Sequence, residues 1–87
     1  MATERQYEVL SAFFSAEQSR LPAPTYRDLA TRFDWSSLST ARDHIRALVR
    51  QGLLERVSDT TQSRPWRLSD AGTKLVRAWR ARVEMTT

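Results

Sequence analysis

An 87-residue chain has room for one small domain with a single core, but too little material for a core and an elaborate enzyme cleft. It carries 14 lysines and arginines, nearly all of them arginines, against 10 acidic residues, and the net charge of +4 suits a polyanionic partner. The absence of cysteine excludes disulfides, and a single histidine cannot build a metal site alone, so we expect no cofactor.

The first predicted element is a helix from about Glu4 to Gln18. Thr3 and Gln6 have the spacing of a capping box, and no proline or glycine interrupts the residues that follow. Helical spacing divides the apolar side chains between two faces, so this helix needs a second packing partner besides the main core. The two faces consist of Tyr7, Leu10 and Phe14, and of Val9 and Phe13.

Pro22 and Pro24 follow this helix and predict an extended connection from which Leu21 reaches the core. Thr25 is expected to cap a short second helix from Tyr26 to Phe33. The inward side chains of the second helix are predicted to be Leu29, Ala30 and Phe33.

A turn from Asp34 to Ser37, anchored by Trp35, joins the second helix to a third helix that ends at Gly52. Ser36 and Ser37 are both candidate caps, and Ser37 is preferred because an apolar stripe begins directly after it. The stripe consists of Leu38, Ala41, Ile45, Leu48 and Val49. Two helices joined in this way are typical of a helix-turn-helix.

Two stretches with strand character come next, Leu53 to Val57 and Arg64 to Leu68, separated by an entirely polar segment. Trp66 and Leu68 fall on one side of the second stretch. Pro65 cannot donate to a ladder, which places this strand at a sheet edge. We interpret the pair as a β-hairpin, the wing.

Ser69 is expected to cap a last helix from Asp70 to about Met85. The apolar stripe of this helix and the second apolar face of the first helix are too apolar to remain in water. They either pack together within the chain or form a dimer interface, and we expect some of both. The predicted interface residues are Val9, Phe13, Leu75, Trp79 and Val83.

These elements predict an α+β, mainly helical fold, a winged helix-turn-helix with a three-helix core, a β-hairpin wing and an extra C-terminal helix. We expect residues 1–87 to form a single domain. Within it, residues 1–58 hold three helices and the first wing strand, 59–68 complete the wing, and 69–87 form the helix available for dimerisation.

The outward face of the third helix is the predicted DNA-reading surface, because a recognition helix contacts base edges from its N-terminal half. Arginines suit guanine, Asp43 could accept from a cytosine amine, and Thr40 could touch a thymine methyl. Alternatively, this is the solvated face of an amphipathic helix, with a weak ion pair between Asp43 and Arg46. The candidate base-reading residues are Ser39, Thr40, Arg42, Asp43 and Arg46.

Contacts to the DNA backbone are expected from three places: the start of the second helix, the end of the third, and the wing. The alternative interpretations are that Thr25 is only a helix cap, that Tyr26 is only a surface aromatic residue, and that the hairpin is only a solvated hairpin. The candidate backbone contacts are Thr25, Tyr26, Arg27, Arg50, Arg56, Thr61, Gln62, Ser63, Arg64 and Arg67.

No spacing of nucleophile, base and acid is typical of a catalytic site, so we expect no enzyme. His44 lies beside the apolar stripe of the third helix and is expected to be structural, because it lacks partners for metal binding or catalysis. The absence of a long apolar run and of a leader predicts a soluble, cytoplasmic protein with no membrane contact.

Three segments resemble the N-terminal DNA-binding domain of LexA, the repressor family of the bacterial DNA-damage response. They are T-E-R-Q-Y-E-V-L from Thr3, A-P-T-Y-R-D-L-A from Ala23 and H-I-R-A-L-V-R-Q-G-L-L-E from His44. The resemblance extends to about Ser58 and implies a winged helix-turn-helix that binds a two-fold DNA site as a dimer. It also implies base contacts from the positions of Ser37, Ser39, Thr40, Arg42 and Asp43.

Two departures limit what the resemblance carries over. The positions matching Arg42 and Asp43 are both acidic in the LexA pattern, so the operator sequence should differ. LexA continues through a linker into a self-cleaving Ser-Lys peptidase that also dimerises it, whereas this chain ends after the last helix. We therefore expect no self-cleavage and a different pairing surface.

The segment W-R-L-S-D-A-G-T-K-L from Trp66 is similar to the strand-to-helix join of MarR-like and PadR-like regulators, whose terminal helices dimerise. The sequence thus predicts a homodimeric repressor that binds an inverted-repeat operator in double-stranded DNA, with the third helix in the major groove and the wing on the backbone. The alternatives are a protein-interaction module that modulates another regulator, and a weakly specific architectural nucleic-acid-binding protein. A regulatory protein partner is left open.

Overall fold

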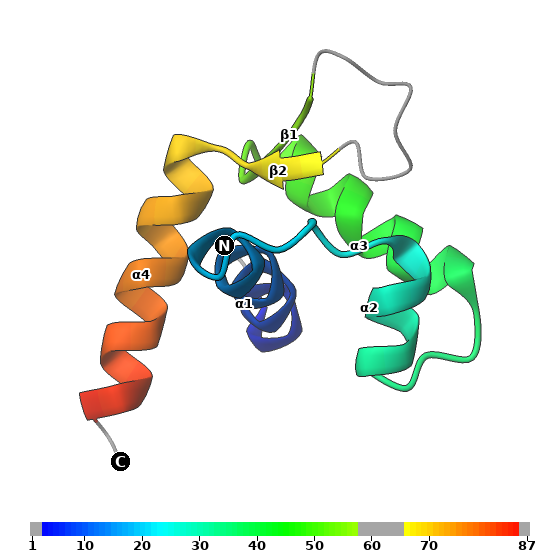
Figure 1. Ribbon diagram of the computed structural model, residues 1–87, viewed down its shortest axis with the longest axis horizontal. Helices are drawn as coiled ribbons and strands as arrows, with labels where there is room; N and C mark the ends of the chain where they lie inside the picture. The colour runs from blue at the N-terminus through cyan, green and yellow to red at the C-terminus, as the bar shows by residue number, and fades with distance from the viewer. Residues whose placement is uncertain (1–2, 58–65, 86–87) are drawn as a thin grey trace.

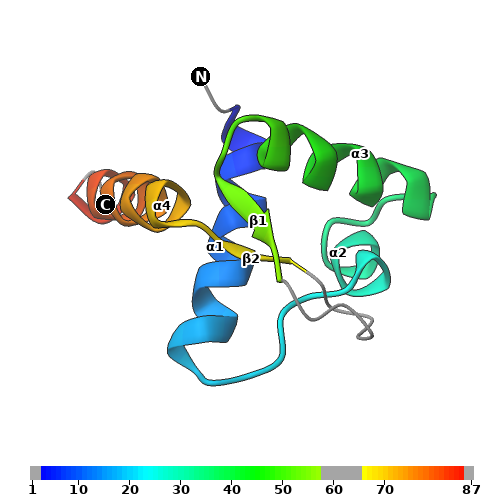
Figure 2. The same cartoon turned by 90° about the horizontal axis from the view of Figure 1, so that it is seen from above.

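A computed structural model of the chain describes residues 3–57 and 66–85 (Figure 1). Its elements, in chain order, are α1 (Glu4–Gln18), α2 (Tyr26–Arg32), α3 (Leu38–Arg50), β1 (Leu54–Arg56), β2 (Trp66–Leu68) and α4 (Asp70–Met85). Helix α1 lies in the middle, with α2 and α3 on one side and α4 on the other (Figures 1 and 2). The predicted winged helix fold, mainly helical with one antiparallel hairpin, is confirmed.

Helices α1 and α2 both begin with a capping box. In α1 the Gln6 amide donates to the Thr3 hydroxyl (3.2 Å), while the Thr3 amide donates to the Gln6 side chain (3.1 Å). In α2 the Asp28 amide donates to the Thr25 hydroxyl and the Thr25 amide to the Asp28 carboxylate, both at 3.0 Å. Each box satisfies two amides that lack a partner within the helix, and a single cap is worth about 1 kcal/mol.

Helix α3 ends at Arg50 and is terminated by Gly52, the glycine predicted to stop it. Gly52 has a φ of 76°, and its amide donates to the carbonyl of Val49 (2.9 Å). The next amide, of Leu53, donates back to Leu48 (2.9 Å), which completes a Schellman motif. Glycine adopts this backbone conformation without steric cost, so the position of Gly52 fixes where the helix stops.

The inner stripe of α3 lies in the core. The side chains of Ala41, Ile45 and Leu48 are completely buried and belong to one cluster with residues from the other helices and the hairpin. Leu38 was expected in this stripe and is instead 45% exposed. It is the first residue of α3, and its side chain covers the surface over the turn before its own Cα, which lies outside the core.

The prediction that Leu21 reaches the core is also wrong, because this side chain is 63% exposed. Arg20 has a φ of 56° and ends α1 in a second Schellman motif, in which the Leu21 amide donates to the Ala16 carbonyl (2.8 Å). This motif holds Leu21 at the surface end of α1.

The second apolar face of α1 packs within the chain. Val9 is 0% and Phe13 2% exposed, and both belong to the core cluster that also holds Val76 of α4. The expectation that Val9 and Phe13 form a dimer interface is therefore wrong, because α4 and the hairpin complete the core around them. Trp79 of α4 is half-buried and stacks on Tyr7 of α1, with ring centroids 5.5 Å apart and planes 2° apart.

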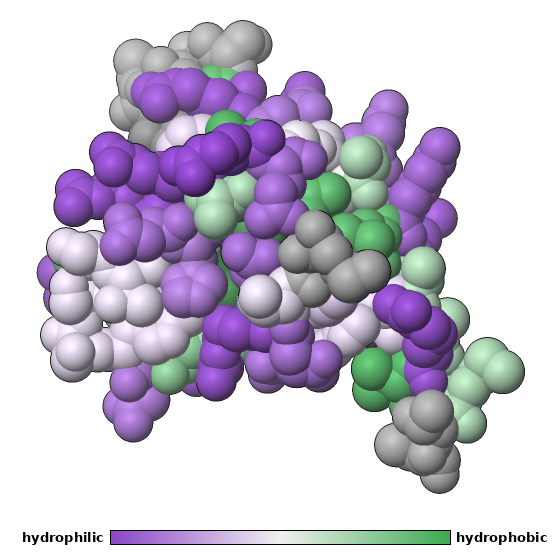
Figure 3. Space-filling model, turned by 180° about the vertical axis from the view of Figure 1, so that it is seen from behind, coloured by the Kyte–Doolittle hydropathy of each residue, from purple (hydrophilic) through white to green (hydrophobic). Residues whose placement is uncertain are grey.

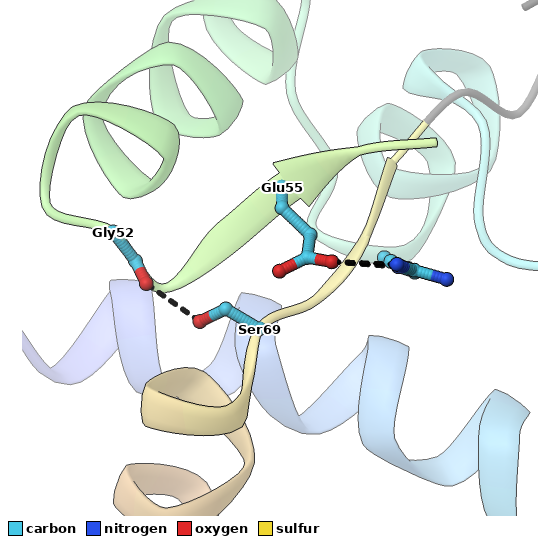
Figure 4. A network of polar contacts seen from close by, with 4 residues as sticks. Gly52, Glu55 and Ser69 are labelled. Carbon is cyan, nitrogen blue, oxygen red and sulfur yellow. Dashed lines mark hydrogen bonds and ion pairs between the residues drawn. The ribbon is translucent and has the colours of Figure 1, made fainter. Parts of the chain in front are cut away.

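One serine joins the hairpin to α4 (Figure 4). The Ser69 hydroxyl accepts from the Gly72 amide (3.0 Å), as expected of a cap, and donates to the Gly52 carbonyl (2.5 Å). Gly72 lies so close to the backbone of Leu53, the residue before β1, that a Cβ at this position would stand 2.0 Å from the Leu53 carbonyl oxygen. This requirement for glycine at position 72 was not predicted from the sequence.

Replacing Gly72 with alanine should therefore destabilise the protein, although helix propensity alone would favour alanine by about 1 kcal/mol. We expect Gly72→Ala to lower the free energy of unfolding by about 1–3 kcal/mol, the usual cost of overpacking, because the Leu53 backbone must move. Urea titration followed by circular dichroism measures this change.

Gly52→Ala is the matched control, because a Cβ there meets nothing within 4 Å and only the positive φ is strained. It should cost about 1–2 kcal/mol and leave the α4 packing unchanged. A Gly72→Ala protein more stable than the wild type would contradict the close approach.

Candidate nucleic-acid interface

The outward face of α3 is polar and basic along its whole length. Ser39, Arg42, Asp43, Arg46 and Arg50 are exposed, and Thr40 is half-buried. In the part of the chain that the structure describes, Asp43 forms no ion pair with Arg46, so the weak local ion pair of the alternative interpretation is absent. The three arginines of this face likewise have no ion-pair partner among the described residues.

The start of α3 is held by its cap. The Ser37 hydroxyl accepts from the Ser39 amide (3.0 Å), which confirms Ser37 as the cap in preference to Ser36. Ser37 is exposed, so its hydroxyl hydrogen remains able to donate outward while its oxygen accepts from the helix.

A stack of four side chains fixes the turn before α3. The Arg5 guanidinium lies 5.0 Å from the centre of the Phe33 ring, Phe33 stacks on Trp35 at 5.1 Å, and Trp35 on His44 at 4.6 Å. His44 also donates from Nδ1 to the Thr40 carbonyl (2.9 Å). The stack connects α1, the end of α2, the turn and α3, and it gives His44 the structural role that was expected.

Only the Trp35 anchor of this stack was predicted. Arg5, Phe33 and His44 come from separate elements, and no periodicity within one element could indicate that they meet. Asp34, next to Trp35, has a φ of 57°, so the turn between the two helices is tight.

At the start of α2, Arg27 is exposed, whereas Thr25 and Tyr26 are half-buried. The capping box uses the amides of Thr25 and Asp28 and brings the Asp28 carboxylate to the positive end of the helix dipole. A phosphate at this place would meet the Arg27 side chain and the remaining amides of the first turn. The Asp28 carboxylate, which was not predicted to lie here, competes with a phosphate for this position.

The base of the wing is partly compensated in charge. Glu55 and Arg67 lie directly opposite each other across the hairpin, and Arg67 Nε and Nη2 are both 2.8 Å from Glu55 Oε2 (Figure 4). Arg56 lies over the Trp66 ring at 5.6 Å. Four of the candidate backbone contacts, Thr61, Gln62, Ser63 and Arg64, lie outside the described residues.

Within residues 3–57 and 66–85, no group of three or more His, Cys, Asp or Glu side chains could hold a metal ion. Over the same ranges, none of the helices has the length and apolarity needed to cross a membrane.

Comparison with known proteins gives a family match and a fold match. Residues 1–64 match the family of the LexA DNA binding domain. The chain is 36% identical over 61 residues to the LexA repressor of Myxococcus xanthus (strain DK1622), and the match covers 70% of this chain and 28% of that protein. It is 34% identical over 61 residues to the LexA repressor of Opitutus terrae, again over 70% of this chain and 30% of that protein. The chain therefore spans less than a third of the length of these repressors.

Among solved structures, the S. aureus MepR–DNA complex is similar to this chain with a TM-score of 0.75 and 26% sequence identity, covering 98% of this chain and 59% of that one. S. aureus MepR bound to ethidium bromide has a TM-score of 0.76 at 24% identity, covering 98% and 59% of the two chains. The likeness extends through α4, beyond the residues that match the family.

Proposed function

The chain belongs to the LexA DNA-binding domain family, and we propose that it is a sequence-specific repressor that binds an inverted-repeat DNA site as a homodimer. The family and the fold are those of DNA-binding transcription regulators rather than enzymes. In this proposal the single domain of residues 1–87 inserts α3 into the major groove and lays the wing on the backbone.

The observation that carries the proposal is the division of α3 into two sides. Ala41, Ile45 and Leu48 of its inner stripe are completely buried, so the opposite side is the one open to a ligand. That side presents Arg42, Arg46 and Arg50, which are exposed and form no ion pair within the described residues. Three uncompensated guanidinium groups on one helix face suit the phosphates and guanine edges of a duplex.

Specific contacts are assigned by position along α3. The first turns of a recognition helix lie deepest in the groove, so base reading falls to its N-terminal half, and Arg50 at the far end meets a phosphate. Arg27 at the start of α2 and Arg56 at the base of the wing flank this face, and Arg67 shares its charge with Glu55. The proposed base-reading residues remain Ser37, Ser39, Thr40, Arg42, Asp43 and Arg46.

We propose that the dimer interface lies on the C-terminal half of α4, and no longer includes Val9 and Phe13. Val83 is 41% and Met85 86% exposed, and apolar surface gathers at that end of the helix, at the lower right of Figure 3. Leu75 and Trp79 are partly buried against the core and can contribute only their outer edges. The MepR likeness, which includes α4, gives loose support to the expected similarity with MarR-like regulators.

Selection from random DNA duplexes tests the proposal as a whole. Purified protein is mixed with the pool at moderate salt, and the bound fraction is sequenced. An enriched inverted repeat with half-sites about one helical turn apart is expected of a dimeric specific regulator. Salt-sensitive binding without enrichment would instead indicate an architectural role, and no binding would indicate a protein-interaction module.

On the selected duplex, base-reading and backbone arginines should behave differently. Arg46→Ala should cost about 1–3 kcal/mol on the preferred sequence and relax the preference at one base pair. Arg27→Ala should weaken all duplexes alike and reduce the slope of log affinity against log salt by about one. Fluorescence anisotropy over a salt series measures both effects.

Arg82→Ala is the matched control, because Arg82 is exposed on α4 and carries the same charge away from α3. For Arg82→Ala, the slope of log affinity against log salt should equal that of the wild type. If Arg46→Ala and Arg27→Ala lost the same affinity on every duplex, the assignment of Arg46 as a base-reading residue would be contradicted.

The dimer surface is tested by Val83→Asp, which places a charge on the exposed apolar end of α4. Trp79→Ala is a poorer probe, because Trp79 also stacks on Tyr7 within the chain. Sedimentation should show that Val83→Asp is monomeric, with a helical spectrum like that of the wild type. Arg82→Asp, a charge change on the neighbouring residue, should remain a dimer. If Val83→Asp sedimented as a dimer to the same extent as the wild type, the proposed interface would be refuted.

A further inference from the structure

The last turn of α3 and the first turn of α4 meet at one joint, and we propose that Ser69 is a positioning residue that sets the angle between these helices. Through that angle Ser69 would set the distance between the two reading faces of a dimer, and hence the spacing of the half-sites it accepts. The effect on half-site spacing rests on the proposed function, whereas the fixed angle does not.

The joint is a set of hydrogen bonds centred on one side chain. The Ser69 hydroxyl donates to the Gly52 carbonyl at the end of α3 (2.5 Å) and accepts from the Gly72 amide in α4 (3.0 Å). The Ser69 amide donates to the Leu53 carbonyl (3.1 Å). A hydroxyl can donate and accept at once, so a single oxygen connects the two helix ends directly.

The surroundings leave this joint little room to adjust. Leu53 is 8% exposed and is tied back to α3 by the Schellman bond to Leu48. The same Leu53 carbonyl faces Gly72 at a distance that would not admit a methyl group. The end of α3, the start of β1 and the first turn of α4 are therefore packed at backbone contact.

The length of α4 gives a small change at the joint a large effect. With 16 residues, α4 is about 24 Å long at 1.5 Å per residue. Val76 and the stack of Trp79 on Tyr7 also hold α4 against α1, so a rotation at Ser69 requires these contacts to shift with the helix. A rotation of about 10° would then displace the far end of the helix by about 4 Å, comparable to the 3.4 Å between base pairs. That end carries the proposed pairing surface. A change of about 10° in the angle at Ser69 would therefore change the half-site spacing by about one base pair.

Distances between spin labels test the fixed angle without DNA. The chain has no cysteine, so Arg42→Cys and Arg82→Cys place labels on exposed positions of α3 and α4 alone. Labelled protein is diluted with unlabelled protein to suppress distances between protomers. Ser69→Ala should broaden or shift the distance distribution, and Ser69→Thr, which keeps the hydroxyl, should restore it.

Thr3→Ala is the matched control, because it removes the cap of α1 and leaves the joint intact. It should lower the melting temperature and leave the label distances unchanged. An unchanged distribution in Ser69→Ala would overturn the proposal.

A second readout concerns half-site spacing. On the inverted repeat selected by the wild type, Ser69→Ala should discriminate about fivefold less against a spacer changed by one base pair, the factor expected from one net hydrogen bond. Its affinity for an isolated half-site should stay within about twofold of the wild type. A purely structural loss would weaken all these duplexes in proportion and overturn the role in spacing.

Failure of the proposed function can be told apart from failure of this inference. A wild type that selects no inverted repeat would overturn both the dimeric function and the role of Ser69 in spacing. The label distances would still decide whether Ser69 fixes the angle between α3 and α4.

Discussion

The close approach of Gly72 to the Leu53 carbonyl is the constraint on which most of the fold depends. Because no Cβ stands between them, the first turn of α4 lies directly on the backbone of Leu53, between α3 and β1. From there α4 runs beside α1, where Val76 joins the core that surrounds Val9 and Phe13. Without this approach the second apolar face of α1 would lack the packing partner that its sequence requires.

Helix α3 separates the side chains that stabilise the fold from those proposed for recognition. Its buried side packs into the core, its end is fixed by Gly52, and its first turn is held by Ser37 and by the stack of Trp35 on His44. Its other side contributes little to any of these contacts. The proposed recognition surface therefore has a backbone held by these contacts, while its side chains stay exposed to a ligand.

The sequence predicted the features that depend on local chemistry. Caps such as Thr3 and Ser37, the stop at Gly52 and the periodicity of α3 were all identified correctly, because each reflects residues a few positions apart. Periodicity also indicated that the Val9 face would be buried, but it could not tell whether the covering partner belongs to the same chain or to a second copy.

Contacts between distant segments were beyond the reach of sequence patterns. The stack from Arg5 to His44 and the contact of Gly72 with Leu53 join residues from separate elements. The exposure of Leu21 and Leu38 depends on where helix ends stand relative to the core, which hydrophobicity does not reveal. For the candidate site, the sequence predicted which face of α3 is outward. It did not predict that the Asp28 carboxylate accepts from the Thr25 amide at the start of α2, or that Glu55 pairs with Arg67.

The separation of the two sides of α3 also bears on evolution. Substitutions at exposed positions away from caps and packing usually change stability by no more than about 0.5 kcal/mol, so Arg42, Asp43 and Arg46 can be exchanged at little cost to folding. A duplicated gene could thus acquire a new target sequence through a few neutral steps. Arg42 stands where the LexA pattern is acidic, which fits such a divergence, in which related domains come to recognise different sequences.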